Sequence, residues 1–180
     1  MSDAHMEKAQ ENKDEKEILS LNMRMLDNVV SATFRQIGFY DFEMKLHKEY
    51  EKKWFLPAER IDELFEQSVQ PTLWKAFQNS LPYKKDWVTN RHIRQWFVTA
   101  RYTPWFLLGY HIFTAVKKNP QYYQVFKNNF LKAWSSKPPK EIFANMWIDI
   151  TSKQFWKDCY ENMRELYEDV KSDAERLGMV

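Results

Sequence analysis

The feature of this sequence that most restricts its fold is the scarcity of glycine. Only three of the 180 residues are glycine, and no Asn-Gly or Asp-Gly pair is present to form a tight hairpin turn. Aromatic residues are abundant instead, with eight Trp, nine Tyr and thirteen Phe. Because large aromatic side chains pack well between helices, we expect an all-α fold with about seven helices in a single domain.

The chain divides into a short polar start and one long helical region. Residues 1–14 are charged and aperiodic, so we expect a flexible polar tail or the frayed start of a helix there. Residues 15–180 form the predicted helical domain. Apolar residues recur at helical spacing from Glu15 to about Lys53, which predicts one long helix. Gly38 lies inside it and indicates either close packing by another element or a kink.

Further helices are expected where the apolar spacing resumes after a break. They cover residues 57–77 with a break or kink at Pro71, then 86–98, 105–118, 121–134 and 140–146. Thr151 and Gln154 have the spacing of a capping box and open the last helix. Cys159 lies in the apolar stripe of that helix, and we expect it to be a buried core residue.

Charge and hydropathy exclude several classes of protein. The net charge of +2 gives no electrostatic case for a nucleic acid or an anionic membrane. The longest apolar stretch, from Pro104 to Val116, is too short to span a bilayer, and the first twenty residues lack the apolar run of a signal peptide. The single cysteine excludes an intrachain disulfide. We therefore expect a cytoplasmic protein with no membrane partner.

The four histidines, His5, His47, His92 and His111, offer no metal site of their own. None lies three or four residues from another, so no helical turn presents a pair of ligands. We therefore expect no metal and no other cofactor. The neighbouring carboxylates Glu49 and Glu51, and Asp62 and Glu63, are expected to be solvated charges on exposed helix faces.

The segment from Lys84 to Arg101 combines basic and aromatic residues, as a nucleic-acid-binding module does. Its Trp87, Trp96 and Phe97 fall largely on the inward face of the expected helix, where they cannot stack on bases. A nucleic-acid-binding module is therefore kept only as an alternative.

Three stretches in the same order and spacing resemble the zinc oligopeptidases of the thimet oligopeptidase and oligoendopeptidase F kind. Phe34-Arg35-Gln36 with Phe42-Glu43 resembles an F-R-Q…F-E helix of that family. The segment from Leu131-Lys132-Ala133 to Phe155-Trp156 resembles its closing segment. The resemblance covers about Leu19 to Val170 and implies the C-terminal helical part of the catalytic domain. Those enzymes hold zinc with an H-E-x-x-H helix and a downstream Glu, and H-E-x-x-H is absent from these 180 residues.

The third stretch, from Thr99 to Tyr110, resembles the family's substrate wall, in which a histidine precedes a P-F-Y-V-Y-x-Y-like segment. Such donors stabilise the oxyanion that forms during hydrolysis. Anchored on Pro104, the histidine position falls at Thr99 or Ala100, and two tyrosines are replaced by Phe106 and Leu108. The resemblance thus implies a remnant of the substrate cleft at Tyr102, Phe106, Leu108 and Tyr110. For Tyr110 we prefer a core tyrosine with a bonded hydroxyl over a surviving site residue.

The loss of both the metal-binding helix and most of the wall leads to our interpretation. We expect a non-catalytic relative of the zinc oligopeptidases that binds a protein or a peptide, with self-association as one possibility. The first alternative is one piece of a split or truncated zinc metalloendopeptidase, in which a partner carries H-E-x-x-H and supplies the zinc ligands. The second alternative is the nucleic-acid-binding module.

Overall fold

Helices make up nearly all the regular structure of this protein, as expected. The computed structural model describes residues 3–73, 85–95, 97–133 and 136–179, and no strand occurs among them. Contacts between Cα atoms group the chain into two units: unit 1 comprises residues 1–27 and 107–180, and unit 2 comprises residues 28–106. Trp74, Phe77, Trp96 and Trp134, which were assigned to helices from the sequence, lie outside the described residues.

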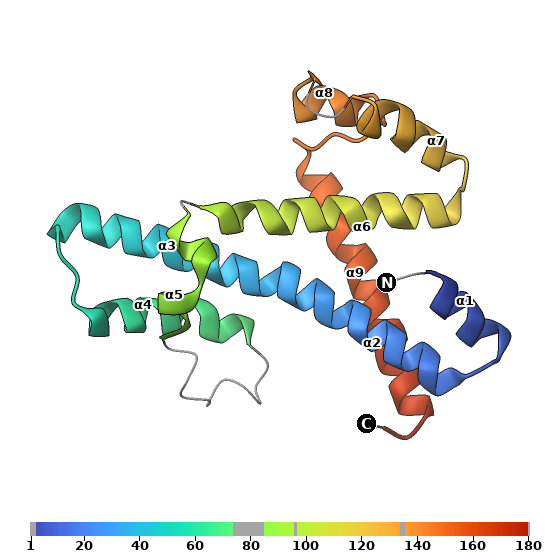
Figure 1. The fold of residues 1–180 in the computed structure, drawn as a ribbon, viewed down its shortest axis with the longest axis horizontal. Helices are drawn as coiled ribbons and strands as arrows, with labels where there is room; N and C mark the ends of the chain where they lie inside the picture. The colour runs from blue at the N-terminus through green and yellow to red at the C-terminus, as the bar shows by residue number, and fades with distance from the viewer. Residues whose placement is uncertain (1–2, 74–84, 96, 134–135, 180) are drawn as a thin grey trace. The chain divides into compact units, whose positions relative to one another are not determined.

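Unit 2 is built on two antiparallel helices. α3 (Phe34–Lys53) and α4 (Ala58–Val69) fold back on each other, as Figure 1 shows, and their contacts are the most extensive in the chain. The 3₁₀ turns η1 (Gln70–Thr72), η3 (Arg91–Arg94) and η4 (Val98–Arg101) and the short helix α5 (Asp86–Thr89) also belong to the unit. Its core consists of buried apolar residues from both helices and the turn between them: Phe39, Phe42, Leu56, Leu64, Phe65 and Val69.

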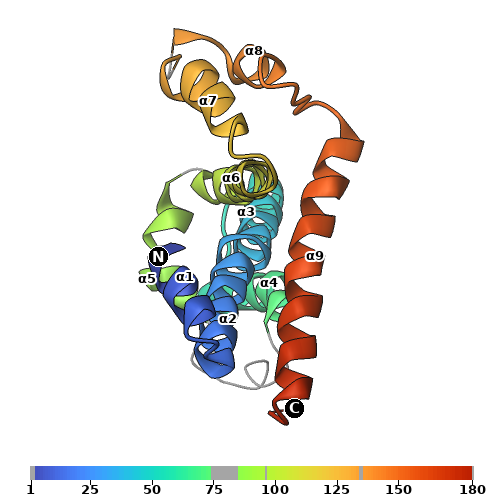
Figure 2. The same ribbon diagram turned by 90° about the vertical axis from the view of Figure 1, so that its right-hand side faces the viewer.

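Unit 1 contains α1 (Asp3–Glu11), α7 (Tyr122–Phe126), the π-helical turn η5 (Lys127–Leu131), α8 (Pro139–Ala144) and α9 (Lys153–Arg176). Figure 2 shows α9 as one uninterrupted helix. The helices α2 (Glu15–Ala32) and α6 (Tyr102–Lys118) each contribute residues to both units. The core of unit 1 includes the buried residues Leu108, Ile112, Phe143, Met146 and Ile148.

The first residues of the chain form a helix. For residues 1–14 we expected a flexible polar tail or the frayed start of a helix, and the structure has α1 there with Ala9 buried. At the start of α2, Glu15 forms an ion pair of 2.6 Å with Arg176 of α9.

α2 and α3 are separated by a break at Thr33, where the sequence predicted one continuous helix. Thr33 is fully buried, and its hydroxyl donates to the carbonyl oxygen of Val29 at 2.5 Å. The hydroxyl of Thr103 donates to the carbonyl oxygen of Thr33 at 3.1 Å. Hydroxyl groups that bond to a helix backbone commonly bend the helix. The helix is therefore interrupted at Thr33 and runs without a break through Gly38.

Gly38 provides close packing instead, which was one of the two expected roles. A Cβ atom at this position would lie 3.0 Å from Cγ2 of Thr72 and 3.1 Å from the carbonyl oxygen of Ser68. Real Cβ atoms rarely approach other atoms so closely. The absence of a side chain at Gly38 therefore lets α3 approach the end of α4.

The prediction of a single helix over residues 86–98 is wrong. The backbone of Asn90 is extended, and its side-chain oxygen accepts the His92 N–H at 3.0 Å. Asn side chains compete with helix backbone bonds in this way, so α5 ends and η3 begins. A second interruption comes at Phe97, whose φ of 56° is left-handed.

The last helix starts one residue later than the predicted capping box implies. Ser152 is its N-cap, and the Ser152 hydroxyl accepts the Phe155 N–H at 3.4 Å. The Thr151 hydroxyl donates to Asp149 at 2.6 Å and so is already engaged before the helix begins. Cys159 is buried on this helix, as predicted, and burial raises the pKa of its thiol to about 11.

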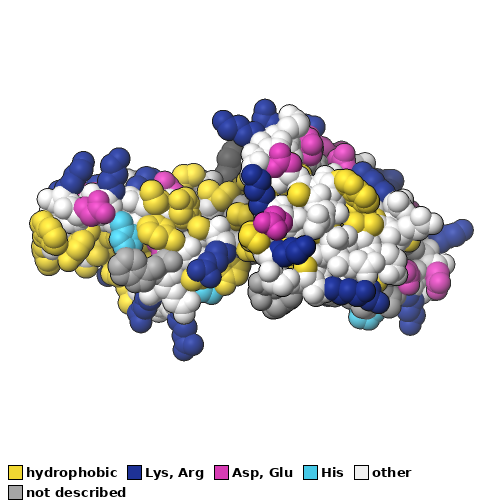
Figure 3. All heavy atoms as spheres, turned by 90° about the horizontal axis from the view of Figure 1, so that it is seen from above, with side chains coloured by type: hydrophobic (Ala, Val, Ile, Leu, Met, Phe, Trp, Pro, Cys, Tyr) yellow, Lys and Arg dark blue, Asp and Glu magenta, His cyan; other side chains and the backbone are white. Residues whose placement is uncertain are grey.

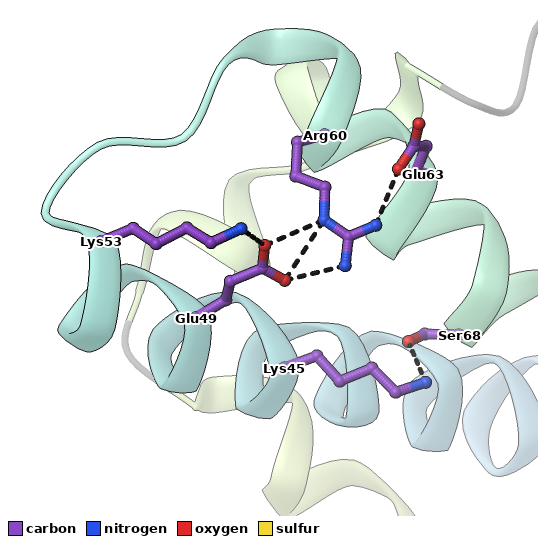
Figure 4. A network of polar contacts seen from close by, with 6 residues as sticks. All are labelled: Lys45, Glu49, Lys53, Arg60, Glu63 and Ser68. Carbon is purple, nitrogen blue, oxygen red and sulfur yellow. Dashed lines mark hydrogen bonds and ion pairs between the residues drawn. The ribbon is translucent and has the colours of Figure 1, made fainter.

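A network of charged side chains joins α3 to α4 (Figure 4). The guanidinium of Arg60 donates to both carboxylate oxygens of Glu49 at 2.8–3.2 Å and to Glu63 at 2.7 Å. Lys53 donates to the same Glu49 at 2.7 Å. The hydrogen bond from Arg60, followed by that from Lys53, lowers the pKa of Glu49 to about 2. The expectation that Glu49 is a merely solvated charge is therefore wrong, because two cations bind it.

Exposed aromatic residues surround the turn between α3 and α4. Trp54 and Phe55 are 78% and 72% exposed, and hydrophobic side chains are visible over this end of unit 2 in Figure 3. Trp54 has a φ of 59° and lies 6.5 Å from the ring of Tyr50. In unit 1, Trp147 is 80% exposed with a φ of 61°. Left-handed backbone of this kind favours glycine, so both tryptophans occupy positions that do not suit their side chains.

Candidate functional site

Thr99, one of the two predicted histidine positions, is a buried residue of η4. Its side chain is fully buried, and its hydroxyl donates to Oε2 of Glu43 at 2.7 Å. Oε1 of the same carboxylate accepts the backbone N–H of Phe97 at 3.1 Å. A carboxylate is costly to bury unless hydrogen bonds satisfy it. The Glu43–Thr99 pair therefore fixes η4 against α3. The other candidate, Ala100, is half-buried and brings no polar side chain.

Glu43 is the residue whose role the sequence did not predict. It belongs to the Phe42-Glu43 pair of the family-like helix, and α3 presents Phe42 to the apolar core while Glu43 faces η4. Its two partners lie 54 and 56 residues further along the chain, a separation that local spacing cannot reveal. One signal in the sequence could have indicated this role. An acidic residue directly follows a phenylalanine of the apolar helix face, and a charge that is buried at such a position needs a hydrogen-bond partner.

Phe97 lies between two rings of α3. Its ring centroid is 5.1 Å from that of His47 and 6.0 Å from that of Tyr40. These two residues are seven apart, so they lie on one face of α3, and Glu43 lies between them on the same face. The left-handed backbone at Phe97 is thus stabilised by the Glu43 carboxylate and by packing of the side chain.

Tyr102, the first residue of the predicted cleft remnant, is 38% exposed. Its hydroxyl lies 3.0 Å from Nε2 of His92, and the two rings are 5.1 Å apart. The contact joins η3 to the start of α6 within unit 2. Tyr102 is therefore a polar, partly accessible side chain beside an imidazole.

Phe106 and Leu108 supply no hydrogen-bond donor, and their positions differ. Phe106 is half-buried at the end of unit 2. Leu108 is 3% exposed and belongs to the core of unit 1, where it packs with Ile112 and Phe143. The predicted cleft position Leu108 is therefore occupied by a core side chain.

Tyr110 is half-buried in unit 1. Burial, with smaller contributions from Asp169 and Glu165 on α9, raises the pKa of its phenol, so the hydroxyl stays protonated. The ring of the neighbouring His111 packs edge-on against Phe155 at 5.1 Å, and burial is the main cause that lowers the pKa of this imidazole. Burial favours the neutral form of both side chains, and at His111 Asp158 opposes this effect while Lys118 adds to it.

The described residues of this chain do not fit the family's zinc site. Over residues 3–73, 85–95, 97–133 and 136–179, no group of three or more His, Cys, Asp or Glu side chains could hold a metal ion. His92 is paired with Tyr102, and His47 packs on Phe97. Among these described residues, no helix has both the length and the apolar character of a membrane span.

Comparisons with known proteins agree with the family resemblance. An oligoendopeptidase F from Lactococcus lactis subsp. cremoris and an oligoendopeptidase F homologue from Lactococcus lactis subsp. lactis are each 25% identical to the chain over 167 residues. The matched region covers 93% of this chain but only 27% of each relative, so the chain spans about a quarter of their length. No solved structure matches the chain. The sequence profile of peptidase family M3 matches residues 1–162, and the chain therefore belongs to peptidase family M3.

Proposed function

We propose that this chain is a helical module that binds a protein or a peptide and does not hydrolyse peptides by itself. The observation that carries the proposal is the burial of Leu108 in the core of unit 1. Resemblance to the family places a tyrosine hydroxyl at this position, and here a core side chain fills it. A wall that stabilises an oxyanion needs donors aimed at the reacting group, and Leu108 offers none.

The surroundings of Thr99 support the same proposal. Its hydroxyl is bound to the buried Glu43 and is therefore not available to a substrate. Metal-dependent hydrolysis also needs a water molecule activated by the metal, and H-E-x-x-H is absent from the sequence. The cytoplasmic location expected from the sequence stays a prediction.

An assay of the purified chain tests whether it hydrolyses peptides. A quenched fluorogenic peptide is incubated with the chain, with and without added zinc, and we expect no increase in fluorescence. Metal analysis after dialysis should find well under one zinc per chain. Hydrolysis that a chelator abolishes would contradict the proposal, because it would require a metal site built from residues assigned here to structure.

Binding is tested in parallel with short labelled peptides of differing composition. Fluorescence anisotropy should rise for at least one class of peptide, and the bound peptide should be recovered intact. If no peptide binds, and the chain stays monomeric without a co-purifying protein, the binding proposal fails.

A second candidate function rests on the length of the match. The family match covers most of this chain but about a quarter of the relatives' length. We therefore also propose that the chain could complete a zinc peptidase when a partner supplies H-E-x-x-H. Ala100→His and Phe106→Tyr are suitable probes, because both sites are only half-buried, unlike Thr99 and Leu108.

In the split-enzyme case, these two changes should raise the activity of a co-purified complex and leave the isolated chain inactive. Unchanged activity of an active complex would argue against a role of this wall in hydrolysis. The absence of any co-purifying zinc-binding protein would favour the simple binding module.

A further inference from the structure

Cations dominate the surface of η3, η4 and the start of α5. Lys85, Arg91, Arg94 and Arg101 are all exposed, and we call these four residues the cationic ridge. Asp86 is the only acidic residue between 85 and 101, so this stretch of the described chain carries a net charge of +3 (four cations minus one anion). The protein as a whole carries only +2. The ridge is therefore a local concentration of positive charge.

The arginines of the ridge come from two turns that contact each other. Arg91 and Arg94 are three residues apart on the 3₁₀ turn η3, and residues with this spacing lie on the same side of such a turn. Arg101 ends η4, which contacts η3. The hydrogen bond between Tyr102 and His92 joins η3 to the first residue of α6, which directly follows η4. The guanidinium groups are thus presented from one small part of unit 2.

These cations are not neutralised within the described part of the chain. Arg94 donates to the carbonyl oxygen of Val88, a neutral partner. No ion pair joins Lys85, Arg91 or Arg101 to a described acidic residue. Arg60, by contrast, is bound to Glu49 and Glu63. The ridge therefore keeps its capacity to bind anions.

The backbone that carries the ridge is held in place before any ligand arrives. Glu43 accepts hydrogen bonds from Phe97 and Thr99 at the start of η4, and Asn90 accepts one from His92 in η3. Ordering a flexible loop on binding costs free energy, and a preformed segment avoids that cost. The backbone of the ridge is therefore preformed for binding.

We propose that the cationic ridge binds an acidic segment of a peptide or protein through its carboxylates. Guanidinium groups bind carboxylates through two parallel hydrogen bonds, which a lysine cannot form. Three of the four ridge cations are arginines. The hydroxyl of Tyr102, beside His92, adds a further polar group at the edge of the ridge. This inference rests on the proposed binding function and specifies the chemistry of its ligand.

Nucleic acid is the less favoured anion because the aromatic residues of this region are engaged. Trp87 donates its indole N–H to Asp62 at 2.7 Å, and Phe97 packs on His47. Binding of single strands depends on aromatic rings that are free to stack on bases. The ridge offers charge with few stacking surfaces, which suits carboxylates better.

The test uses the full chain and three labelled peptides of equal length: one rich in Asp and Glu, one neutral and one basic. Affinity is measured by fluorescence anisotropy, and a single-stranded oligonucleotide of matched charge is measured alongside. We expect the acidic peptide to bind most tightly and its affinity to fall with added salt. Arg91→Gln combined with Arg101→Gln should weaken that binding by roughly tenfold or more.

The matched control removes the same charge elsewhere in unit 2. Lys48 and Lys52 are exposed on α3, and Lys48→Gln combined with Lys52→Gln should change the affinity for the acidic peptide by less than about twofold. Arg91→Lys combined with Arg101→Lys keeps the charge but removes the forked hydrogen bonds, and it should give an intermediate loss. Because this variant is conservative, it also decides the matter if the Gln variant fails to fold.

Each outcome separates this inference from the broader proposal. Equal losses for the ridge variant and the lysine control would overturn the ridge as the site. Tighter binding of the oligonucleotide than of the acidic peptide would overturn the choice of ligand. Tight binding of the neutral or basic peptide alone would overturn this inference while leaving the peptide-binding function intact.

Discussion

Glu43 is a charged residue that the fold has removed from water, and Thr99 supplies one of its two hydrogen bonds. Replacing Thr99 by valine keeps the shape of the side chain but deletes the hydroxyl. The carboxylate then loses a donor that water cannot replace, so we expect a loss of roughly 1.5–3 kcal/mol in the free energy of unfolding. Urea denaturation measures the change.

The control for this prediction is Thr89→Val. The Thr89 hydroxyl donates to the Asp86 carbonyl oxygen on an exposed turn, and its loss should change stability by no more than about 0.5 kcal/mol. Equal effects of the two valine variants would mean that the Glu43–Thr99 hydrogen bond contributes nothing specific to the fold.

Trp147 is the residue at which the backbone suits glycine best. Its φ of 61° is left-handed, and its side chain is 80% exposed, with one ring contact to Tyr122 at 6.5 Å. Trp147→Gly should therefore relieve strain and lose little packing. We expect the thermal unfolding temperature to stay equal or to rise, by an amount that corresponds to at most about 1 kcal/mol. A clear fall in this temperature would show that the indole packs more firmly than its exposure indicates.

At the scale of the element, packing between α3 and α4 depends on Gly38. Gly38→Ala improves helix propensity by about 1 kcal/mol, but the new Cβ meets Thr72 and the backbone oxygen of Ser68 at 3.0–3.1 Å. A backbone oxygen cannot rotate away, so overpacking should prevail and destabilise the protein by roughly 1–3 kcal/mol. Chemical denaturation gives the sign of the change.

Gly109 in α6 supplies the opposite case within the same chain. Apart from the backbone of its own helix, no described atom lies within 4 Å of a Cβ built at this position, so Gly109→Ala should stabilise the protein by up to about 1 kcal/mol. If both alanine variants changed stability in the same direction, close packing at Gly38 would not be the reason for its glycine.

The ion network between α3 and α4 should make stability depend on pH. The pKa of Glu49 is lowered to about 2 in the folded protein. Its ionised carboxylate therefore stabilises the fold fully at a pH above the pKa of the same group in the unfolded chain. This stabilisation is lost as the pH falls through the pKa of the folded protein. In Arg60→Ala the principal partner is gone. The variant should therefore lose less stability than the parent between about pH 5 and pH 2.

The control for the pH experiment is Arg164→Ala, which breaks an exposed pair with Glu161 on α9. Exposed pairs within one helix contribute little, so the pH profile of this variant should follow that of the parent. If Arg60→Ala and the parent lost the same amount of stability as the pH falls, the role assigned to Glu49 would be contradicted.

The elements themselves show what the sequence can and cannot reveal. The helical class and the burial of Cys159 were predictable, and close packing at Gly38 was one of the two roles expected there, because each depends on local spacing or on residue type. The break at Thr33 was not, since it depends on a hydrogen bond from Thr103, which is 70 residues away. The partner of Glu43 was not predictable either, because Thr99 is 56 residues away in the sequence. The burial of Leu108 in the core of unit 1 is evident only from the side chains that surround it in the structure.

At the scale of the whole molecule, family membership and chain length have different implications. Membership in peptidase family M3 accounts for the helical fold and for the order of the three family-like stretches. The match covers 93% of this chain and 27% of each oligoendopeptidase F relative, so the absence of hydrolysis by this chain stays a proposal. The side chains of Thr99 and Leu108 are buried, and the function proposed above therefore relies on what the surface binds.

The single buried cysteine makes opening of unit 1 measurable as a rate. Cys159 is 1% exposed with a thiol pKa of about 11, and only an exposed thiolate reacts quickly with an alkylating reagent. Labelling of the native chain should therefore be slow and should follow the transient opening of α9. Met163→Ala, one helical turn away and buried, should accelerate labelling, whereas Lys157→Ala on the exposed face should not. A disulfide-linked dimer of this protein would therefore have to form from molecules in which α9 had opened and exposed Cys159.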